Sequence, residues 1–125
     1  MRPEVEALAR HRLARAREAL SEGEHLMAAG KFMGAVNRFY YGAFHAARAL
    51  LATRQMDSAR HSGVISLFHQ HFATTGLIES ETAKALSRAF EKRQATDYGD
   101  FATITRDEAV RIQQEVQALV EGCGR

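Results

Sequence analysis

The chain has 125 residues, of which 46% are hydrophobic, and its formal net charge at pH 7 is +2. This length favours one domain over residues 1–125 with a substantial core, and this charge excludes a strongly basic protein that binds nucleic acid by charge alone. Cys123 is the only cysteine, so neither an internal disulfide nor a cysteine metal cluster can form.

The N-terminal stretch carries charges throughout, so it lacks the apolar core of a signal peptide. No run approaches the roughly 18 consecutive apolar residues of a membrane span. We therefore expect a cytoplasmic protein with no membrane partner. The histidines do not have the spacing of a zinc motif, and we predict neither a metal site nor a cofactor.

The spacing of apolar residues predicts a first helix from Glu4 to about Glu22. Gly23 and Gly30 bracket a predicted break, or a short second segment over residues 25–29. The apolar stripe of the first helix consists of Val5, Leu8, Ala9, Leu13, Ala16 and Leu20.

The stretch from Lys31 to Arg54 predicts the central helix of the domain, because apolar and aromatic residues recur along it at helical spacing. Its polar residues also lie in a row, at steps of four, four and three, which places them on one side of the helix. A polar row on so apolar a helix must form hydrogen bonds with a ligand, a partner or another helix. We name this row the polar seam and predict that it binds a ligand: Asn37, Tyr41, His45 and Arg48.

A short polar linker over residues 55–60 leads to a predicted third helix. Ser62 is its expected N-cap, and Gly76 is the expected residue just after its end. The residues that we expect to point inward are Val64, Ile65, Phe68 and Phe72.

Ser80 is expected to cap a fourth helix that runs to about Tyr98 and stops at Gly99. Thr105 with Glu108 three residues later is a capping box, which predicts the start of the last helix. We therefore predict an all-α fold, an antiparallel up-and-down bundle of four main helices plus a possible short one. The inner face of the last helix should contain Ile112, Val116, Leu119 and Val120.

The end of the fourth helix holds the residues that best suit chemistry. Arg93 and Asp97 are four apart and therefore share a face, and Tyr98 follows directly. A guanidinium suits a phosphate group, although most pairs of this spacing are surface ion pairs. We predict Arg93, Asp97 and Tyr98 as catalytic or binding residues, the alternative being that they only tie the helix to the core.

Four stretches together match a known pattern: NRFYYGAFHAARALL at 37–51, HSGVISLFHQHF at 61–72, TGLI at 75–78 and SRAFEKRQATDYGDF at 87–101. Their combination resembles the HEPN domain family (higher eukaryotes and prokaryotes nucleotide-binding), and above all its small stand-alone branch. The resemblance implies an up-and-down helical bundle that is usually a homodimer. It also implies a nucleotide or RNA ligand and a minimal nucleotidyltransferase partner, in a system of toxin–antitoxin type.

Many HEPN proteins are metal-independent endoribonucleases whose signature is an Arg followed, after four to six residues, by a His. The family arginine stabilises charge on the scissile phosphate, and the histidine transfers a proton. Arg93 matches the arginine, but Tyr98 stands at the position of the histidine, and no histidine follows His71. Two other pairs have the bare spacing in the wrong part of the chain, Arg38 with His45 and Arg54 with His61, and we interpret both as chance matches.

Three interpretations remain open at this point. The first is a nucleotide- or RNA-associated module that acts with a nucleotidyltransferase. The second is an endoribonuclease in which Arg93, Asp97 and Tyr98 replace the usual pair. The third is a helical interaction protein whose polar seam only sets the register within a bundle or dimer.

Overall fold

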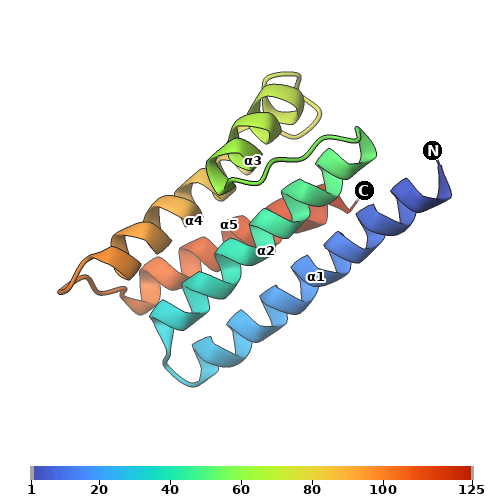
Figure 1. Ribbon diagram of the computed structural model, residues 1–125. Coiled ribbons are helices and arrows are strands. Elements are labelled where there is room, and N and C mark those ends of the chain that lie inside the picture. Colours follow the sequence, from blue (N-terminus) through green and yellow to red (C-terminus); the bar gives the residue numbers. More distant parts are fainter. Residues whose placement is uncertain (1, 125) are drawn as a thin grey trace.

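The computed structural model describes residues 2–124 and confirms the predicted all-α bundle (Figure 1). Five α-helices and one π-helical turn make up the regular structure of the described residues. The ends of the expected domain, residues 1 and 125, lie outside that range. The elements in chain order are α1 (Pro3–Ala28), α2 (Phe32–Thr53), α3 (His61–Phe68), η1 (His69–Ala73), α4 (Ser80–Tyr98) and α5 (Arg106–Cys123).

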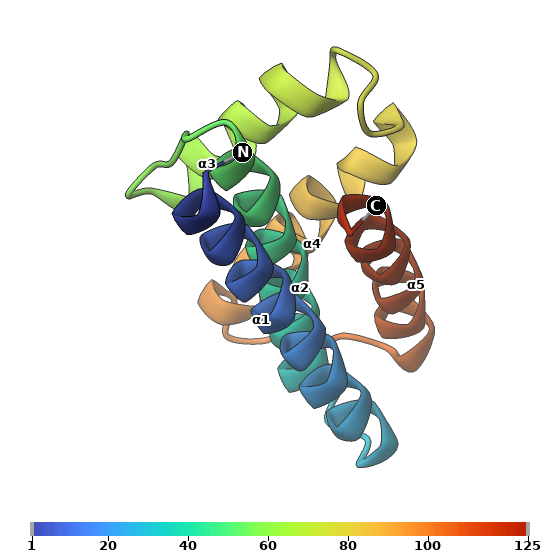
Figure 2. The same cartoon turned by 90° about the vertical axis from the view of Figure 1, so that its right-hand side faces the viewer.

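Helix α2 is the centre of the bundle, as its apolar pattern predicts. It contacts α1 along its length and also packs against α3, α4 and α5. Figure 2 shows α3 and η1 lying across one end of the bundle, above α2 and α4. Phe39 and Tyr40 on α2 are fully buried, and the inner face expected for α5 is buried as well. Among residues 2–124, no helix is both long enough and apolar enough to cross a membrane.

The predicted break at Gly23 is wrong, because α1 continues without interruption to Ala28. Gly23 is buried, and a Cβ atom added to it would lie 2.6 Å from Cδ1 of Phe39. The absence of a side chain at Gly23 therefore leaves room for the Phe39 ring of α2 to pack against α1. The chain reverses at Gly30, whose φ of +75° is a left-handed conformation that glycine adopts without strain.

The predicted N-cap of the third helix is two residues late. α3 begins at His61, with Arg60 at the N-cap in an extended conformation, and Ser62 lies inside the first turn. The backbone N–H of Arg60 donates to Oγ of Ser58, so the linker residue Ser58 holds the chain where the helix begins. Gly76, expected just after the end of this helix, lies three residues beyond the end of η1 and has a φ of +79°, which glycine adopts without strain.

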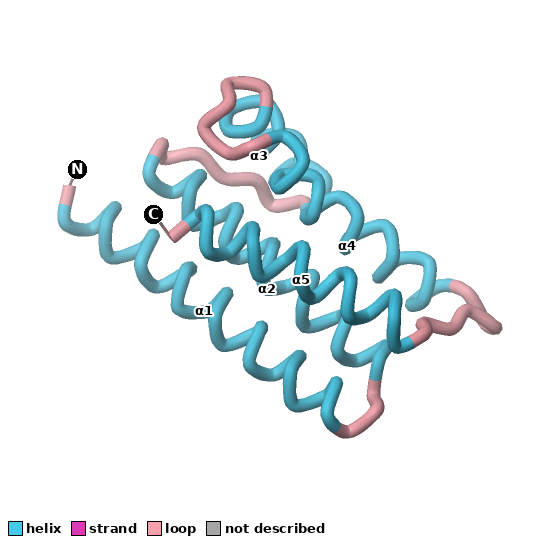
Figure 3. The backbone as a smooth tube through the Cα atoms, turned by 180° about the vertical axis from the view of Figure 1, so that it is seen from behind, coloured by secondary structure: helices cyan, strands magenta, loops and turns pink. Residues whose placement is uncertain are grey.

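Local sequence signals predicted the start of α5 better than the start of α4. Ser80 is the first helical residue of α4 and not its cap, since the residue before it, Glu79, occupies the N-cap. The Thr105–Glu108 capping box is present in both directions and starts α5 as predicted. Figure 3 shows the longer connections, between α2 and α3 and between α4 and α5, at opposite ends of the bundle.

Candidate functional site

Arg93 on α4 points across the bundle at two aromatic rings of α2. Its guanidinium carbon lies 5.3 Å from the ring centre of Tyr40 and 5.2 Å from that of Tyr41. At such distances a guanidinium is attracted to the faces of aromatic rings. The contact stabilises one orientation of Arg93, whose side chain keeps 22% of its surface exposed.

Asp97 forms the predicted ion pair with Arg93. Nε of Arg93 lies 3.2 Å from Oδ2 of Asp97, yet the direction of the N–H bond does not meet hydrogen-bond geometry. Nε is buried and has no hydrogen-bond acceptor among the described residues. A buried donor without a hydrogen-bond acceptor is uncommon in a folded protein, and here the charge of Asp97 is its nearest compensation.

Tyr98 does not join this pair in the structure. The residue is 83% exposed, and Phe101 in the following loop is 96% exposed. The alternative, in which these three residues only tie the helix to the core, is therefore wrong for Tyr98. An exposed aromatic ring next to a charged pair can instead contact a base or a partner surface.

His61 also belongs to this site, although the sequence pattern gave it no role. The hydroxyl of Tyr40 lies 2.6 Å from Nδ1 of His61, and the imidazole stacks on Phe44 with ring centres 4.3 Å apart. Its ring centre is 5.9 Å from that of Tyr41, which also contacts Arg93. His61 of α3 and Arg93 of α4 thus lie beside the same tyrosine rings of α2.

Burial and charge hold both members of the hydrogen-bonded pair neutral. Burial raises the pKa of the Tyr40 hydroxyl above its usual value of 10.0, against the opposing influence of Arg93. Burial also lowers the pKa of His61 below 6.5, and Arg93 and Arg48 add to this effect by repelling a second positive charge. At pH 7 a phenol therefore meets an uncharged imidazole.

The polar seam divides among several partners. Asn37 accepts a hydrogen bond of 3.1 Å from Nη2 of Arg38, while Tyr41 lies under both Arg38 and Arg93. The pKa of His45 is lowered to about 4, first by burial and then by nearby arginines of α1 and α2. Because a histidine with this pKa is neutral at pH 7, His45 does not supply a proton there.

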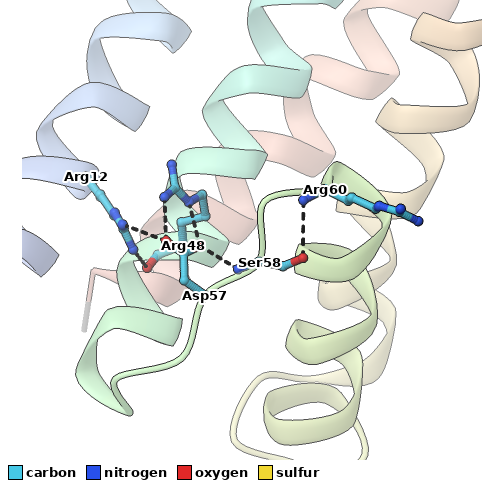
Figure 4. Close-up of polar contacts among 5 residues, drawn as sticks. All are labelled: Arg12, Arg48, Asp57, Ser58 and Arg60. Atoms are coloured by element: carbon cyan, nitrogen blue, oxygen red, sulfur yellow. Dashed lines mark hydrogen bonds and ion pairs between the residues drawn. The ribbon is translucent and has the colours of Figure 1, made fainter.

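Arg48, the last residue of the seam, is part of an ion-pair network around Asp57 (Figure 4). Asp57 accepts from Arg48 at Oδ1 (3.2 Å) and at Oδ2 (2.8 Å), and also from Nη2 of Arg12 at 3.2 Å. The backbone N–H of Ser58 donates to the same carboxylate. One side chain of the linker thereby connects α1 and α2 to the segment that precedes α3.

Two hollows on the surface differ in their charge. The slightly larger one, about 570 Å³, lies between α2, η1, α4 and α5, and its ionisable groups are the carboxylates Glu79 and Glu121, which repel anions. The other, about 540 Å³, is shallow and has a mixed lining, in which the cation Arg48 is paired with the carboxylate of Asp57 and His61 lies beside them. It is lined by Phe44, Arg48, Asp57, Ser58, Ala59 and His61.

A model of the HEPN domain matches residues 9–125 of the sequence. The chain belongs to the HEPN domain family. This finding confirms the resemblance in the four sequence stretches and agrees with the helical bundle described above.

Similar proteins come from archaea and bacteria. A UPF0332 protein of Thermotoga maritima is 38% identical over 86 residues, which are 69% of this chain and 65% of that protein. "Putative toxin MJ0605" of Methanocaldococcus jannaschii is 32% identical over 121 residues, 97% of this chain and 87% of that protein. The match covers less than two thirds of the Thermotoga relative, and only 56% of UPF0332 protein PH1297 of Pyrococcus horikoshii, which is 40% identical over 63% of this chain.

Compared with the family motif, the chain has the expected arginine, Arg93, and an imidazole in an unexpected place, that of His61. Arg93 lies on α4, ahead of Tyr98 where the family motif has its histidine. An imidazole beside the tyrosine ring that Arg93 contacts, Tyr41, comes from α3 instead, from His61. A guanidinium, an imidazole and aromatic rings from three helices thus lie around Tyr41, and a guanidinium is suited to binding a phosphate group.

Proposed function

We propose that this HEPN protein binds the phosphate groups of a nucleotide or RNA at Arg93. One observation carries the proposal: the guanidinium is held over Tyr40 and Tyr41 with a buried Nε that has no hydrogen-bond acceptor among residues 2–124. An arginine fixed in this way loses little conformational freedom when it binds a phosphate. Asp97 orients it, and Tyr98 is available to contact a base.

The wider role that we propose is that of a cytoplasmic module in a toxin–antitoxin-like system, with a nucleotidyltransferase as its partner. Two relatives of Methanocaldococcus jannaschii support this role by their names, "Putative toxin MJ0605" and "Putative toxin MJ0142". We keep the seam in the proposed site: Tyr41 lies under Arg93, Arg48 lines the hollow beside His61, and Asn37 and His45 complete the row.

A metal-independent endoribonuclease is the second candidate function. The observation that favours it is the presence of His61 beside the same tyrosine ring as Arg93, since an arginine and an imidazole are the groups such chemistry requires. Bulk RNA incubated with the purified protein, with and without EDTA, separates the two candidates. Cleavage that survives EDTA supports the nuclease, whereas binding without cleavage supports the module.

The test of the proposed function is an Arg93→Ala variant in an RNA-binding titration. We expect affinity for a short single-stranded RNA to fall by about 10- to 100-fold, because a hydrogen bond to a charged group contributes roughly 1.5–3 kcal/mol. Fluorescence anisotropy at fixed salt measures the affinity, and salt must be fixed because phosphate binding depends on it.

Arg88→Ala is the matched control, because Arg88 lies on the same helix and its exposed side chain pairs with Glu81 and Glu115. The substitution removes the same charge as Arg93→Ala. Because Arg88 is not part of the proposed site, we expect the RNA affinity of this variant to stay within about twofold of the wild type. If both variants lost the same affinity for RNA, the loss would be an effect of net charge and not of the site around Arg93. An Arg93→Ala protein that unfolds, or that binds like the wild type, would show that the cluster is structural.

We also propose that the protein is a homodimer. The proposal rests on the family and on the half-buried seam, whose polar side chains a second copy would cover. Light scattering at tens of micromolar protein should give twice the chain mass of 13.9 kDa. A mass of one chain at that concentration argues against the dimer.

A further inference from the structure

The starting observation is a buried hydroxyl with a single partner. Tyr40 has 0% of its surface exposed, so water does not reach its hydroxyl. Among residues 2–124, its only hydrogen-bond partner is Nδ1 of His61, at 2.6 Å. A phenol hydroxyl can donate one hydrogen bond, and a buried donor that stays unpaired is destabilising.

This arrangement decides which nitrogen of His61 carries the proton. If Nδ1 held it, the imidazole would donate to the tyrosine oxygen and the hydroxyl hydrogen would have no acceptor. If Nε2 holds it, the hydroxyl donates to the lone pair of Nδ1 and both groups are satisfied. Burial raises the pKa of Tyr40, so its hydroxyl keeps the hydrogen that it donates.

The other edge of the imidazole then faces away from the buried tyrosine. In an imidazole ring the two nitrogens point in divergent directions, so Nε2 points away from Tyr40. His61 lines the shallow hollow beside Arg48, and the stack on Phe44 at 4.3 Å fixes the plane of the ring. Nε2 has no hydrogen-bond partner among the described residues.

We propose that His61 is a second phosphate-binding residue of this site, which offers its Nε2–H as a neutral hydrogen-bond donor, and that Tyr40 is the positioning residue that fixes this tautomer. The inference rests on the proposed function, because it assumes that Arg93 binds a phosphate group. It deepens that function because it assigns His61 a role in binding. The endoribonuclease, our second candidate function, would instead need His61 to transfer a proton.

The charged groups around the ring agree with a neutral donor. Arg93 on α4 and Arg48 on α2 disfavour an imidazolium, while Asp57 in the linker already accepts hydrogen bonds from two arginines. Tyr41 adds an uncharged ring from α2. With Nδ1 occupied by Tyr40, His61 has no free lone pair with which to take a proton from a ribose hydroxyl. In this tautomer His61 is therefore suited to holding a phosphate group of the proposed ligand and not to acting as the base that cleaves RNA.

The tautomer can be observed directly by long-range ¹H–¹⁵N NMR of the ¹⁵N-labelled protein. At pH 7 we expect the shifts of a neutral imidazole with the proton on Nε2. In Tyr40→Phe the donor to Nδ1 is gone, so the signals should move toward a mixture of tautomers. A wild-type spectrum with the proton on Nδ1, or with a full imidazolium at pH 7, overturns the inference.

Binding of a short single-stranded oligouridylate completes the test. His61→Ala should weaken binding about 5- to 10-fold, as expected for the loss of one hydrogen bond, whereas His61→Gln, whose amide can donate from the position of Nε2, should recover most of the loss. Equal binding by His61→Ala and wild type overturns the inference alone, provided that Arg93→Ala still binds weakly. If Arg93→Ala also binds like the wild type, or if the wild type does not bind RNA, the proposed function fails and the inference fails with it.

Discussion

A Phe39→Ala variant should lose about 3–5 kcal/mol of its free energy of unfolding. Phe39 is 0% exposed and lies on the central helix, where its ring fills the space that the missing side chain of Gly23 leaves on α1. Removing the ring opens a cavity between two long helices that cannot collapse far, because their backbones are held along their whole length. Urea unfolding followed by circular dichroism measures the change.

Phe101→Ala is the matched control for this substitution. It removes the same ring from a side chain that is 96% exposed, so we expect a change within about 0.5 kcal/mol. An unfolding midpoint of Phe39→Ala equal to that of the wild type would mean that the ring is not part of the core. A similar loss in both variants would point to an effect on the unfolded chain.

The sequence predicted best those features that depend on neighbouring residues. The capping box of Thr105 and Glu108 involves only four consecutive residues, so its outcome did not depend on the rest of the fold. Gly23 shows the opposite case. A glycine inside a helical pattern reads as a break, but here Phe39 of another helix occupies the space beside it, and that partner is not visible from the local pattern.

The same distinction applies to the candidate site. Arg93 and Asp97 form their pair because helical spacing alone brings them together. His61 and Asp57 were missed since their partners, Tyr40 and Arg12, lie on other helices and no spacing rule connects them. The linker that contains Asp57 looked like an ordinary polar connection, although it sets the position at which α3 begins.

Replacement of Asp57 by Asn is the second substitution for which we expect a large effect. Its carboxylate accepts hydrogen bonds from Arg12 and Arg48, whose side chains are only 12% and 26% exposed. Asn keeps the size but removes the charge, so two arginines remain close together with no anion between them. Each charged hydrogen bond contributes roughly 1.5–3 kcal/mol when buried. The side chain of Asp57 is 45% exposed, and screening by solvent reduces the expected total loss to about 2 kcal/mol.

The pH dependence of that loss identifies the carboxylate as its cause. Hydrogen bonds from Arg48 lower the pKa of Asp57 from 3.8 to about 2 in the folded protein. A group whose pKa is depressed on folding stabilises fully above its unfolded value and loses this contribution as pH falls toward the folded value. The difference in unfolding free energy between wild type and Asp57→Asn should therefore be equal at pH 7 and pH 5, and should narrow only below pH 3.8.

Asp100→Asn is the control, because Asp100 is an exposed residue of the α4–α5 loop, and its unfolding free energy should equal that of the wild type at both pH values. A difference between wild type and Asp57→Asn that already shrinks between pH 7 and pH 5 would assign the effect to a histidine, and the absence of any difference would show that the linker does not depend on Asp57.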